Sequence, residues 1–382
     1  MKYYIIAGEA SGDLHASNLM KAIFKKDHEA EIHFWGGDLM QKVGGTLIKH
    51  YKELSFMGFI EVIMNLGTIF KNISFCKKNI AEFNPDVIIF IDYSGFNLRI
   101  AKWAKLQGFN TNYYISPQVW ASRAGRIKKI KRDIDKMYVI LPFEEAFYKK
   151  HGYKVTFVGH PLIDAIAEIK SVDEQQFRKK YQLSNKPIIA LLPGSRKQEI
   201  TKMLSIMLKM VDKFKDYQFV IAGAPSQDFN FYQPFIKNNK VKFIQNKTYD
   251  LLSMSFAALV TSGTATLETA LFKVPQVVCY KGSTISYQIA KRIITIKFIS
   301  LVNLILDKEI VTELIQHDFN EKKLRQELTK ILEDKHRKEL FLEYTKLEKI
   351  LGGKGASEKT AELIVANLNK KFLETNYPRG KP

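Results

Sequence analysis

Short apolar runs recur along this 382-residue chain, and each leads through a turn of small residues into a helical pattern. The run at 2–7 enters the turn at 8–13, and the runs at 86–91, 187–192 and 256–260 behave in the same way. Continuous apolar runs are typical of strands buried on both faces of a parallel sheet. Their alternation with helices predicts an α/β fold of two Rossmann-like parallel-sheet domains that face a cleft.

The boundary between the two domains is predicted from a shift in composition. Residues 166–186 are charged and lack strand-like runs, and the chain is long enough for two cores. We therefore expect an N-terminal domain over 1–165 and a C-terminal domain over 166–356. The glycines at 352–355 precede a final helix that Ser357 can cap.

Composition points to a folded protein in a reducing compartment. Hydrophobic residues make up 46% and charged residues 26% of the chain. The two cysteines, Cys76 and Cys279, exclude a disulfide framework, and no cysteine and histidine cluster has zinc spacing, so no metal is predicted. The apolar start is too short for a signal peptide, and no uncharged run reaches the ~20 residues that span a bilayer. We expect a cytoplasmic protein.

The net charge of +20, from 59 basic and 39 acidic residues, favours an anionic partner. Nucleic acid, acidic lipid and phosphorylated substrates all fit, and general lysine enrichment is the alternative. The densest basic cluster lies on a helical pattern at 123–132, as Arg123, Arg126, Lys128, Lys129, Lys131 and Arg132. It is either a solvated helix face or a surface for acidic lipid or phosphate. No nucleic-acid recognition module accompanies it.

The segment 261–268 (TSGTATLE) follows a strand-like run and opens a helix. Unpaired first-turn amides and the positive helix end attract phosphate, and Gly263 lets a ligand approach the backbone. Ser262 and Thr264 add hydroxyl donors. Glu268 lies within about two turns, where it can face the ribose of a nucleotide. An ordinary helix packed on a sheet is the alternative.

Asp92 stands at the carboxyl end of the apolar run 86–91. Open α/β sheets bind ligands at the carboxyl ends of their strands, so Asp92 is a candidate general base. A helix N-cap is an equally good interpretation.

The segment 56–75 has a narrow polar stripe, formed by Glu61, Asn65, Thr68 and Asn72, and an unusually wide apolar arc. The helix is either buried on most sides or dips an apolar face into a membrane or acyl chains. The contact residues of the second interpretation are Phe59, Ile63, Leu66 and Phe70.

Several phrases, in order along nearly the whole chain, resemble the lipid-A-disaccharide synthase family. They are GEASGD at 8–13, FMGFIEV at 56–62, ID at 91–92, SPQVWA at 116–121, LPFE at 141–144, VGHP at 158–161, LPGSR at 192–196, SGTA at 262–265 and SLVNL at 300–304. The resemblance implies an inverting, metal-independent glycosyltransferase of the GT-B fold without a cofactor. It would join UDP-2,3-diacylglucosamine to 2,3-diacylglucosamine 1-phosphate at the cytoplasmic face of the inner membrane, with an anionic membrane as peripheral partner and no nucleic acid.

The resemblance also implies roles for single residues. Asp92 would be the base, and Arg196, Ser262, Gly263 and Thr264 would meet the charge of the departing diphosphate. Glu268 would bind ribose and Asn303 would lie near the donor. Glu9, Ser11 and Asp13 would face the sugars, and the helix at 357–382 would return to the first domain.

The chain departs from the family pattern at three places. The usual APDFN after the base is YSGFN at 93–97, so a second carboxylate is missing at Gly95. The usual WAWR is WASR at 120–123, and the usual LPN is LVN at 301–303.

Two other functions compete with this one. Another UDP-sugar enzyme of the same architecture, an N-acetylglucosaminyltransferase or a 2-epimerase, would use substrates without acyl chains. A basic nucleic-acid-binding protein would bind duplex with a steep salt dependence.

Overall fold

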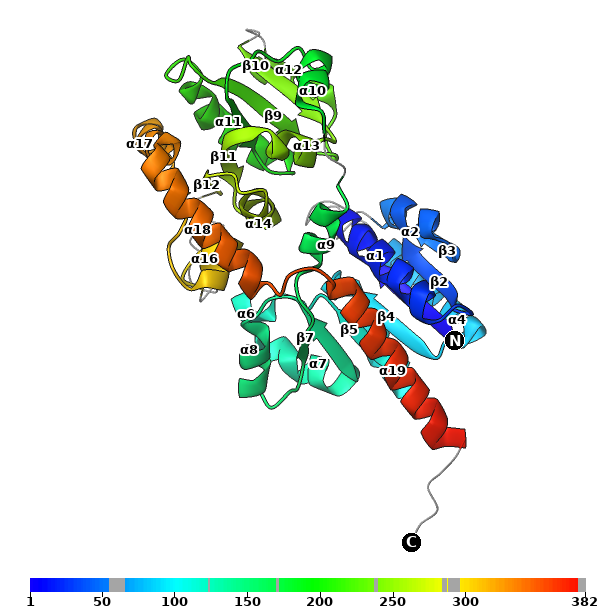
Figure 1. Ribbon diagram of the computed structural model, residues 1–382. Helices are drawn as coiled ribbons and strands as arrows, with labels where there is room; N and C mark the ends of the chain where they lie inside the picture. Colours follow the sequence, from blue (N-terminus) through cyan, green and yellow to red (C-terminus); the bar gives the residue numbers. More distant parts are fainter. Residues whose placement is uncertain are drawn as a thin grey trace. The chain divides into compact units, whose positions relative to one another are not determined.

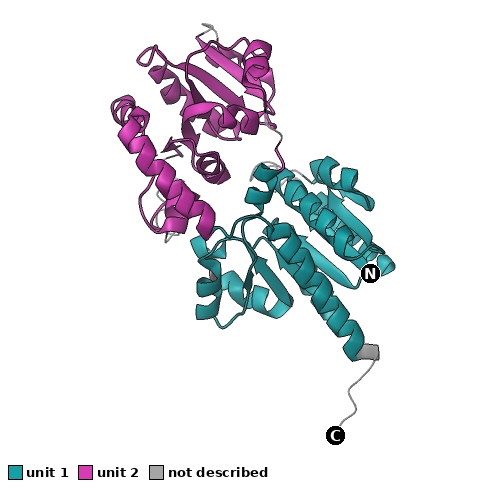
Figure 2. Cartoon of the chain, viewed as in Figure 1, with its two compact units in different colours: residues 1–167, 351–382 teal, residues 168–350 magenta. Residues whose placement is uncertain are grey.

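The computed structural model describes residues 1–54, 66–122, 124–169, 172–236, 240–283, 287 and 296–376. The chain divides into two compact units, one of residues 1–167 with 351–382 and the other of residues 168–350 (Figure 2). Each unit has its own parallel sheet, which confirms the predicted α/β class. The sequence placed the boundaries at 165/166 and 356/357, and the units change over at 167/168 and 350/351.

Unit 1 is built on a seven-stranded parallel sheet of order β3-β2-β1-β4-β5-β6-β7 (Figure 1). Its strands are β1 (Lys2–Ala7), β2 (Glu31–Gly36), β3 (Thr46–His50), β4 (Val87–Ile91), β5 (Thr111–Tyr114), β6 (Lys136–Val139) and β7 (Thr156–Phe157). Its helices are α1 (Ala10–Lys26), α2 (Asp38–Val43), α4 (Leu66–Phe83), α5 (Ser94–Leu106), α6 (Val119–Ser122), α7 (Ile127–Asp133), α8 (Glu144–Lys150), α9 (Pro161–Ala167) and α19 (Ala356–Asn376).

Side-chain alternation along the strands of unit 1 supplies two cores, one on each face of the sheet. Tyr4 and Ile6 of β1 point into the core that α4 and α5 cover. Tyr3 and Ile5 point into the opposite core, which α1 and α19 complete with the side chains Leu19, Ile23, Ile364 and Leu368. The last helix therefore packs beside the first, as Figure 1 shows.

Contacts between α9 and the returning chain hold the start of α19. The Asp164 carboxylate accepts the backbone N–H groups of Gly355 at 2.6 Å and Ser357 at 3.0 Å. The His160 N–H donates to the Leu351 carbonyl at 3.0 Å. Because α19 begins at Ala356, Ser357 lies inside the first turn, and its hydroxyl is buried without a well-aligned hydrogen bond among the described residues. The predicted Ser357 cap is wrong, since Asp164 takes that role.

Unit 2 is built on a six-stranded parallel sheet of order β10-β9-β8-β11-β12-β13. Its strands are β8 (Ile188–Leu192), β9 (Gln218–Gly223), β10 (Val241–Gln245), β11 (Ser255–Thr261), β12 (Gln276–Tyr280) and β13 (Glu313–Ile315). Its helices are α10 (Glu174–Lys180), α11 (Lys197–Met207), α12 (Phe229–Ile236), α13 (Thr248–Ser253), α14 (Thr264–Leu271), α16 (Leu301–Leu306), α17 (Glu321–Leu332) and α18 (Asp334–Ile350).

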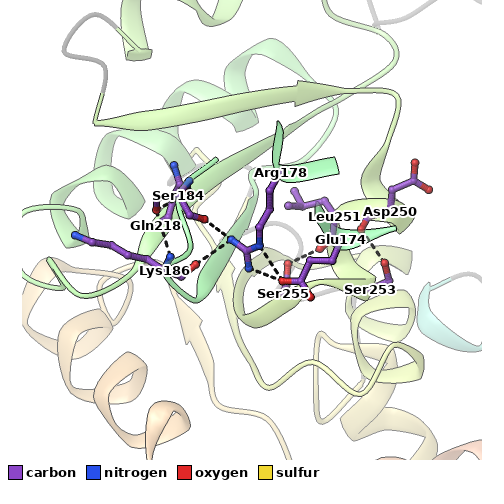
Figure 3. A network of polar contacts seen from close by, with 9 residues as sticks. All are labelled: Glu174, Arg178, Ser184, Lys186, Gln218, Asp250, Leu251, Ser253 and Ser255. Carbon is purple, nitrogen blue, oxygen red and sulfur yellow. Dashed lines mark hydrogen bonds and ion pairs between the residues drawn. The ribbon is translucent and has the colours of Figure 1, made fainter. Parts of the chain in front are cut away.

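A polar network centred on Arg178 anchors the start of unit 2 to its sheet (Figure 3). The Arg178 guanidinium donates to Glu174 at 2.8 Å within α10, to the Ser184 carbonyl and to the Lys186 carbonyl at 3.2 Å. The N–H of Ser184 donates to Gln218 of β9 at 2.7 Å. These bonds fix the path of the chain just before β8.

Each sheet has one point at which the order of its strands reverses. In unit 1 that point lies between β1 and β4, and in unit 2 between β8 and β11. The loops that leave two such strands diverge and leave a crevice at the carboxyl edge, where open α/β sheets bind ligands. These two edges are therefore the places to look for a site.

Candidate active site

The backbone at the carboxyl ends of β4 and β5 is strained. Asp92 and Tyr93 have φ of +44° and +43°, and Ile115 has φ of +66°. L-residues avoid this left-handed region, and a β-branched residue there is exceptional. Strain of this kind persists only where surrounding contacts enforce it, and it clusters at functional sites.

Hydrogen bonds from two buried side chains enforce the conformation of Asp92. The Asp92 carbonyl accepts hydrogen bonds from the side-chain N–H of Asn97 at 2.9 Å and from the hydroxyl of Tyr113. The backbone N–H of Asp92 donates to the backbone carbonyl of Tyr114 at 3.3 Å. The helix α5 has Tyr93 as its N-cap residue and no side-chain cap. Asp92 is therefore not the helix cap that the sequence left open.

The loop after β1 packs directly on this turn. A Cβ at Gly8 would lie 2.2 Å from the ring of Tyr93, so only glycine fits there. This approach brings Glu9 near Asp92, and Glu9 and Ser11 are both exposed at the start of α1. Burial, with a smaller contribution from the charge of Glu9, raises the pKa of Asp92 to about 6. A carboxylate with a pKa just below neutral pH is well suited to act as a general base.

Asp92 lines a cavity of about 300 Å³ at the ends of β4, β5 and β6. The other lining residues are Ser94, Ile115, Ser116, Pro117, Gln118, Ile140, Leu141 and Glu144. Arg126, from the basic cluster, reaches Ser94 with its guanidinium at 3.4 Å. A larger open depression on unit 2 is lined by Lys213 and by side chains of α17 that include Glu321, so it lies along a helix rather than at strand ends.

Asp13 differs from its predicted role on a sugar-facing loop. Its side chain is buried, and its carboxylate accepts the N–H groups of Gly37 at 2.8 Å and of Leu39 and Met40 at 3.0 Å each. These bonds cap α2. The carboxylate is thus committed to holding the loop after β2 against α1.

In unit 2, the turn after β11 presents an uncapped helix start. Gly263 has φ of +148°, and the space where its Cβ would lie is open. The N-cap residue of α14 provides no side-chain cap, and the first turn of the helix holds no acidic residue that would offset the positive end of its dipole. Thr264 is exposed at this helix start, while the Ser262 hydroxyl donates to the Ile299 carbonyl at 2.8 Å.

Glu268 lies one turn further along α14 and has a defined partner. The Tyr249 hydroxyl of α13 donates to its carboxylate at 2.9 Å. Burial raises the pKa of Glu268, and the bond from Tyr249 partly opposes that rise. Among the described residues, the other carboxylate oxygen of Glu268 has no hydrogen-bond partner.

Arg196 lies on the turn after β8, the strand that pairs with β11. It is exposed at the N-cap of α11. The turn needs Gly194, with φ of +99°, because a Cβ there would lie 2.2 Å from the carboxylate of Glu199. Because β8 and β11 are paired in parallel, Arg196 and the turn at 262–264 follow neighbouring strands at the carboxyl edge of the sheet of unit 2.

Asn303 is fully buried, so it can act on the predicted donor site only through other residues. Its amide donates to the Val311 carbonyl and to Glu313, and it accepts two backbone N–H groups, from Ile310 and Val311. Glu313 in turn accepts the N–H of Ile299, whose carbonyl binds Ser262. Asn303 thus supports the turn after β11 through a chain of bonds.

The predicted membrane face lies partly outside the described residues. Phe59 and Ile63 lie outside the described residues, and the side chain of Leu66 is not described. Arg123 of the basic cluster also lies outside them. Phe70 of α4 is 63% exposed and Phe75 is 46% exposed, whereas Asn72 of the predicted polar stripe is buried. The described part of this helix is therefore not buried on most sides. Within the described chain, no helix combines the length and apolar character needed to cross a bilayer.

Sequence reasoning missed two residues. Glu144 was noted only as part of the phrase LPFE, although it is a second buried carboxyl in the Asp92 cavity. Tyr249 lies in no recognised motif, and no local sequence pattern predicts its hydrogen bond to Glu268. Both roles depend on packing between elements that are distant in sequence.

Two parallel-sheet, Rossmann-like units with polar groups at the switch points of their sheets define a protein of the GT-B fold class. Similar folds occur in the UDP-GlcNAc 2-epimerase of Neisseria meningitidis, with a TM-score of 0.67, 14% identity and coverage of 97% of this chain and 100% of that one. The Methanocaldococcus jannaschii UDP-GlcNAc 2-epimerase gives a TM-score of 0.64 at 15% identity over 96% and 100%. At such identities the likeness establishes the fold alone.

The chain belongs to the lipid-A-disaccharide synthetase family, whose model matches residues 3–366. It is 36% identical to the lipid-A-disaccharide synthase of Geobacter metallireducens and 38% identical to that of Syntrophus aciditrophicus, each over 96% of this chain and 97% of the relative. The predicted family is therefore confirmed, and the epimerase alternative shares only the architecture.

Proposed function

We propose that this protein joins UDP-2,3-diacylglucosamine to 2,3-diacylglucosamine 1-phosphate, releases UDP and forms a β-1,6-linked disaccharide. The observation that carries the proposal is the family match over residues 3–366. The chemistry of the site is consistent with it, because Asp92 has the burial and pKa of a general base.

In this reaction Asp92 takes the proton from the 6-hydroxyl of the acceptor as that oxygen attacks the anomeric carbon of the donor. The bond from the anomeric carbon to the diphosphate breaks, and UDP leaves with the electron pair from the opposite side. Attack opposite to departure inverts the anomeric centre. Asp92 then returns the proton to solvent.

The groups on unit 2 are proposed to hold the donor. The exposed helix start at Gly263 and Thr264 and the guanidinium of Arg196 suit the charge that develops on the diphosphate. Glu268, oriented by Tyr249, suits the hydroxyls of the ribose. The proposal requires these groups and Asp92 to meet around one anomeric carbon during turnover.

The test is a transfer assay with both diacyl sugars in detergent, with and without EDTA. We expect UDP release that depends on both sugars and that persists in EDTA. Release without the acceptor, or preference for substrates that lack acyl chains, would favour another UDP-sugar enzyme. No release by folded protein would overturn the proposal.

A further inference from the structure

Glu144 is a second buried carboxyl at the Asp92 cavity, and the proposed reaction gives it no role. It lies in the first turn of α8, is 1% exposed and forms part of the cavity lining. Burying a carboxyl group costs free energy unless hydrogen bonds compensate for its lost hydration. The role inferred for Glu144 rests on the proposed function and concerns the same site.

Glu144 binds the chain that leaves β6. One of its carboxylate oxygens accepts the N–H groups of Ile140 at 3.2 Å and Leu141 at 2.9 Å. Both of these residues line the cavity. The bonds therefore shape the wall that follows β6.

The same carboxyl faces the chain that leaves β5. Ser116 lies beside it, and the Ser116 hydroxyl is 2.6 Å from the hydroxyl of Tyr148, one turn along α8. The indole of Trp120 also faces the carboxyl, with a buried Nε1 that finds no well-aligned partner among the described residues. Trp120 is held edge-on against Phe143 at 5.0 Å between ring centroids.

The segment after β5 needs such support, because Ile115 at its start has φ of +66°. A β-branched residue stays in this conformation only when its neighbours enforce it. Glu144 and Tyr148, both on α8, contact the side chain of the next residue, Ser116. Burial raises the pKa of Glu144 to about 7. Glutamine keeps the size of the side chain and one acceptor oxygen for the N–H groups of Ile140 and Leu141.

We propose that Glu144 is a positioning residue of the acceptor site. By joining the segment after β5 to the segment after β6, it fixes the cavity wall against which the acceptor sugar is presented to Asp92. It does not touch the reacting atoms. Its loss should therefore impair use of the acceptor and leave use of the nucleotide donor, which binds to groups on unit 2, unchanged.

The experiment compares Glu144→Ala, Glu144→Gln and a matched control, Glu145→Ala, in the transfer assay with the full-length protein. The control removes a neighbouring exposed carboxylate that binds the Phe157 N–H at 2.8 Å, away from the cavity. We expect Glu144→Ala to lower kcat/KM for the acceptor about 10- to 100-fold, because small misplacements near the reacting atoms are costly. The donor KM should change less than about 2-fold, and Glu144→Gln and Glu145→Ala should stay within about 3-fold of wild type.

Unchanged acceptor kinetics in Glu144→Ala would overturn the inference, as would equal losses for donor and acceptor. If Glu144→Ala fails to fold, Ser116→Ala breaks the same link from the other side, and it should raise the acceptor KM while sparing the donor KM. A wild-type protein that releases no UDP overturns the proposed function itself. An active wild type with an equally active Glu144→Ala overturns only the role of Glu144.

Discussion

At the scale of single residues, the site depends on a few side chains that hold an unfavourable backbone. Each left-handed residue costs on the order of 1–3 kcal/mol. At Asp92 this cost is met by Asn97 and Tyr113, which are both buried and both bind its carbonyl. The turn can therefore aim its carboxyl into the cavity in a fixed direction, as a general base requires.

Replacing Asp92 by asparagine should keep the shape of the turn but remove the base. We expect turnover to fall by ~10²-fold or more in the UDP-release assay. The control is Asp86→Asn, at the opposite end of the same strand, where the carboxylate accepts the backbone N–H of Lys2 at 2.8 Å at an exposed position. A wild-type rate in Asp92→Asn would remove Asp92 from the base role.

The pKa of Asp92 also predicts the form of the pH profile. A base acts when ionised, so kcat/KM should rise with pH through about 6 and level off above it, rather than through the ordinary 3.8.

At the scale of elements, α19 shows how a helix can depend on a residue far away in the chain. Its start is held by Asp164 of α9, whose carboxylate also suits the positive end of the helix dipole. Its apolar side then completes the core beside α1. The exposed ion pair between Lys25 and Glu358, at 3.2 Å, adds little, because solvent screens it.

Asp164→Ala should therefore destabilise unit 1 by about 1–2 kcal/mol, the usual value of a lost helix cap. We expect a fall of a few °C in Tm and faster amide hydrogen exchange in the first turn of α19. Lys25→Ala, which breaks only the surface pair, serves as the control and should change Tm by less than about 1 °C. Equal effects of the two variants would show that Asp164 is not the cap that holds α19.

At the scale of the whole molecule, charge and exposed apolar side chains suggest a membrane surface as a partner. The net charge is +20, and the basic side chains of α7 are exposed around the buried Ile127 and Ile130. Phe70 and Phe75 add exposed apolar area on α4. Acylated substrates would reach the site from such a surface, and we propose peripheral binding to anionic lipid at the inner face of the inner membrane.

Vesicle flotation tests this proposal. The protein should float with phosphatidylglycerol vesicles at low salt and less so at 1 M salt, where the screening length is about 3 Å, and it should not float with phosphatidylcholine. Phe70→Ser should weaken the binding that survives high salt. Leu106→Ser, which changes a 74% exposed leucine at the end of α5, is the matched control. Failure to float with the anionic vesicles at low salt would contradict the proposal.

Much of the local structure could be predicted, because strand and helix signals are short-range. The run at 2–7 forms β1 with the predicted bounds, and Asp92 follows β4 as expected. Asp13 and Asn303 could not be assigned in this way. Asp13 is bound by Gly37, Leu39 and Met40, and Asn303 by Ile310, Val311 and Glu313. These partners lie in other segments, and sequence alone does not show which polar groups burial will pair.

The amino-acid sequence by itself determined the α/β class, the glycine turns and the family, since these depend on periodicity and on ordered motifs. Only the tertiary structure decided that β1 lies beside β4 and β8 beside β11, which brings together loops that are about 80 and 70 residues apart in the chain. It also decided which carboxyls are desolvated: Asp92 and Glu144 acquire raised pKa values from burial, and burial is a property of the packed fold rather than of any segment.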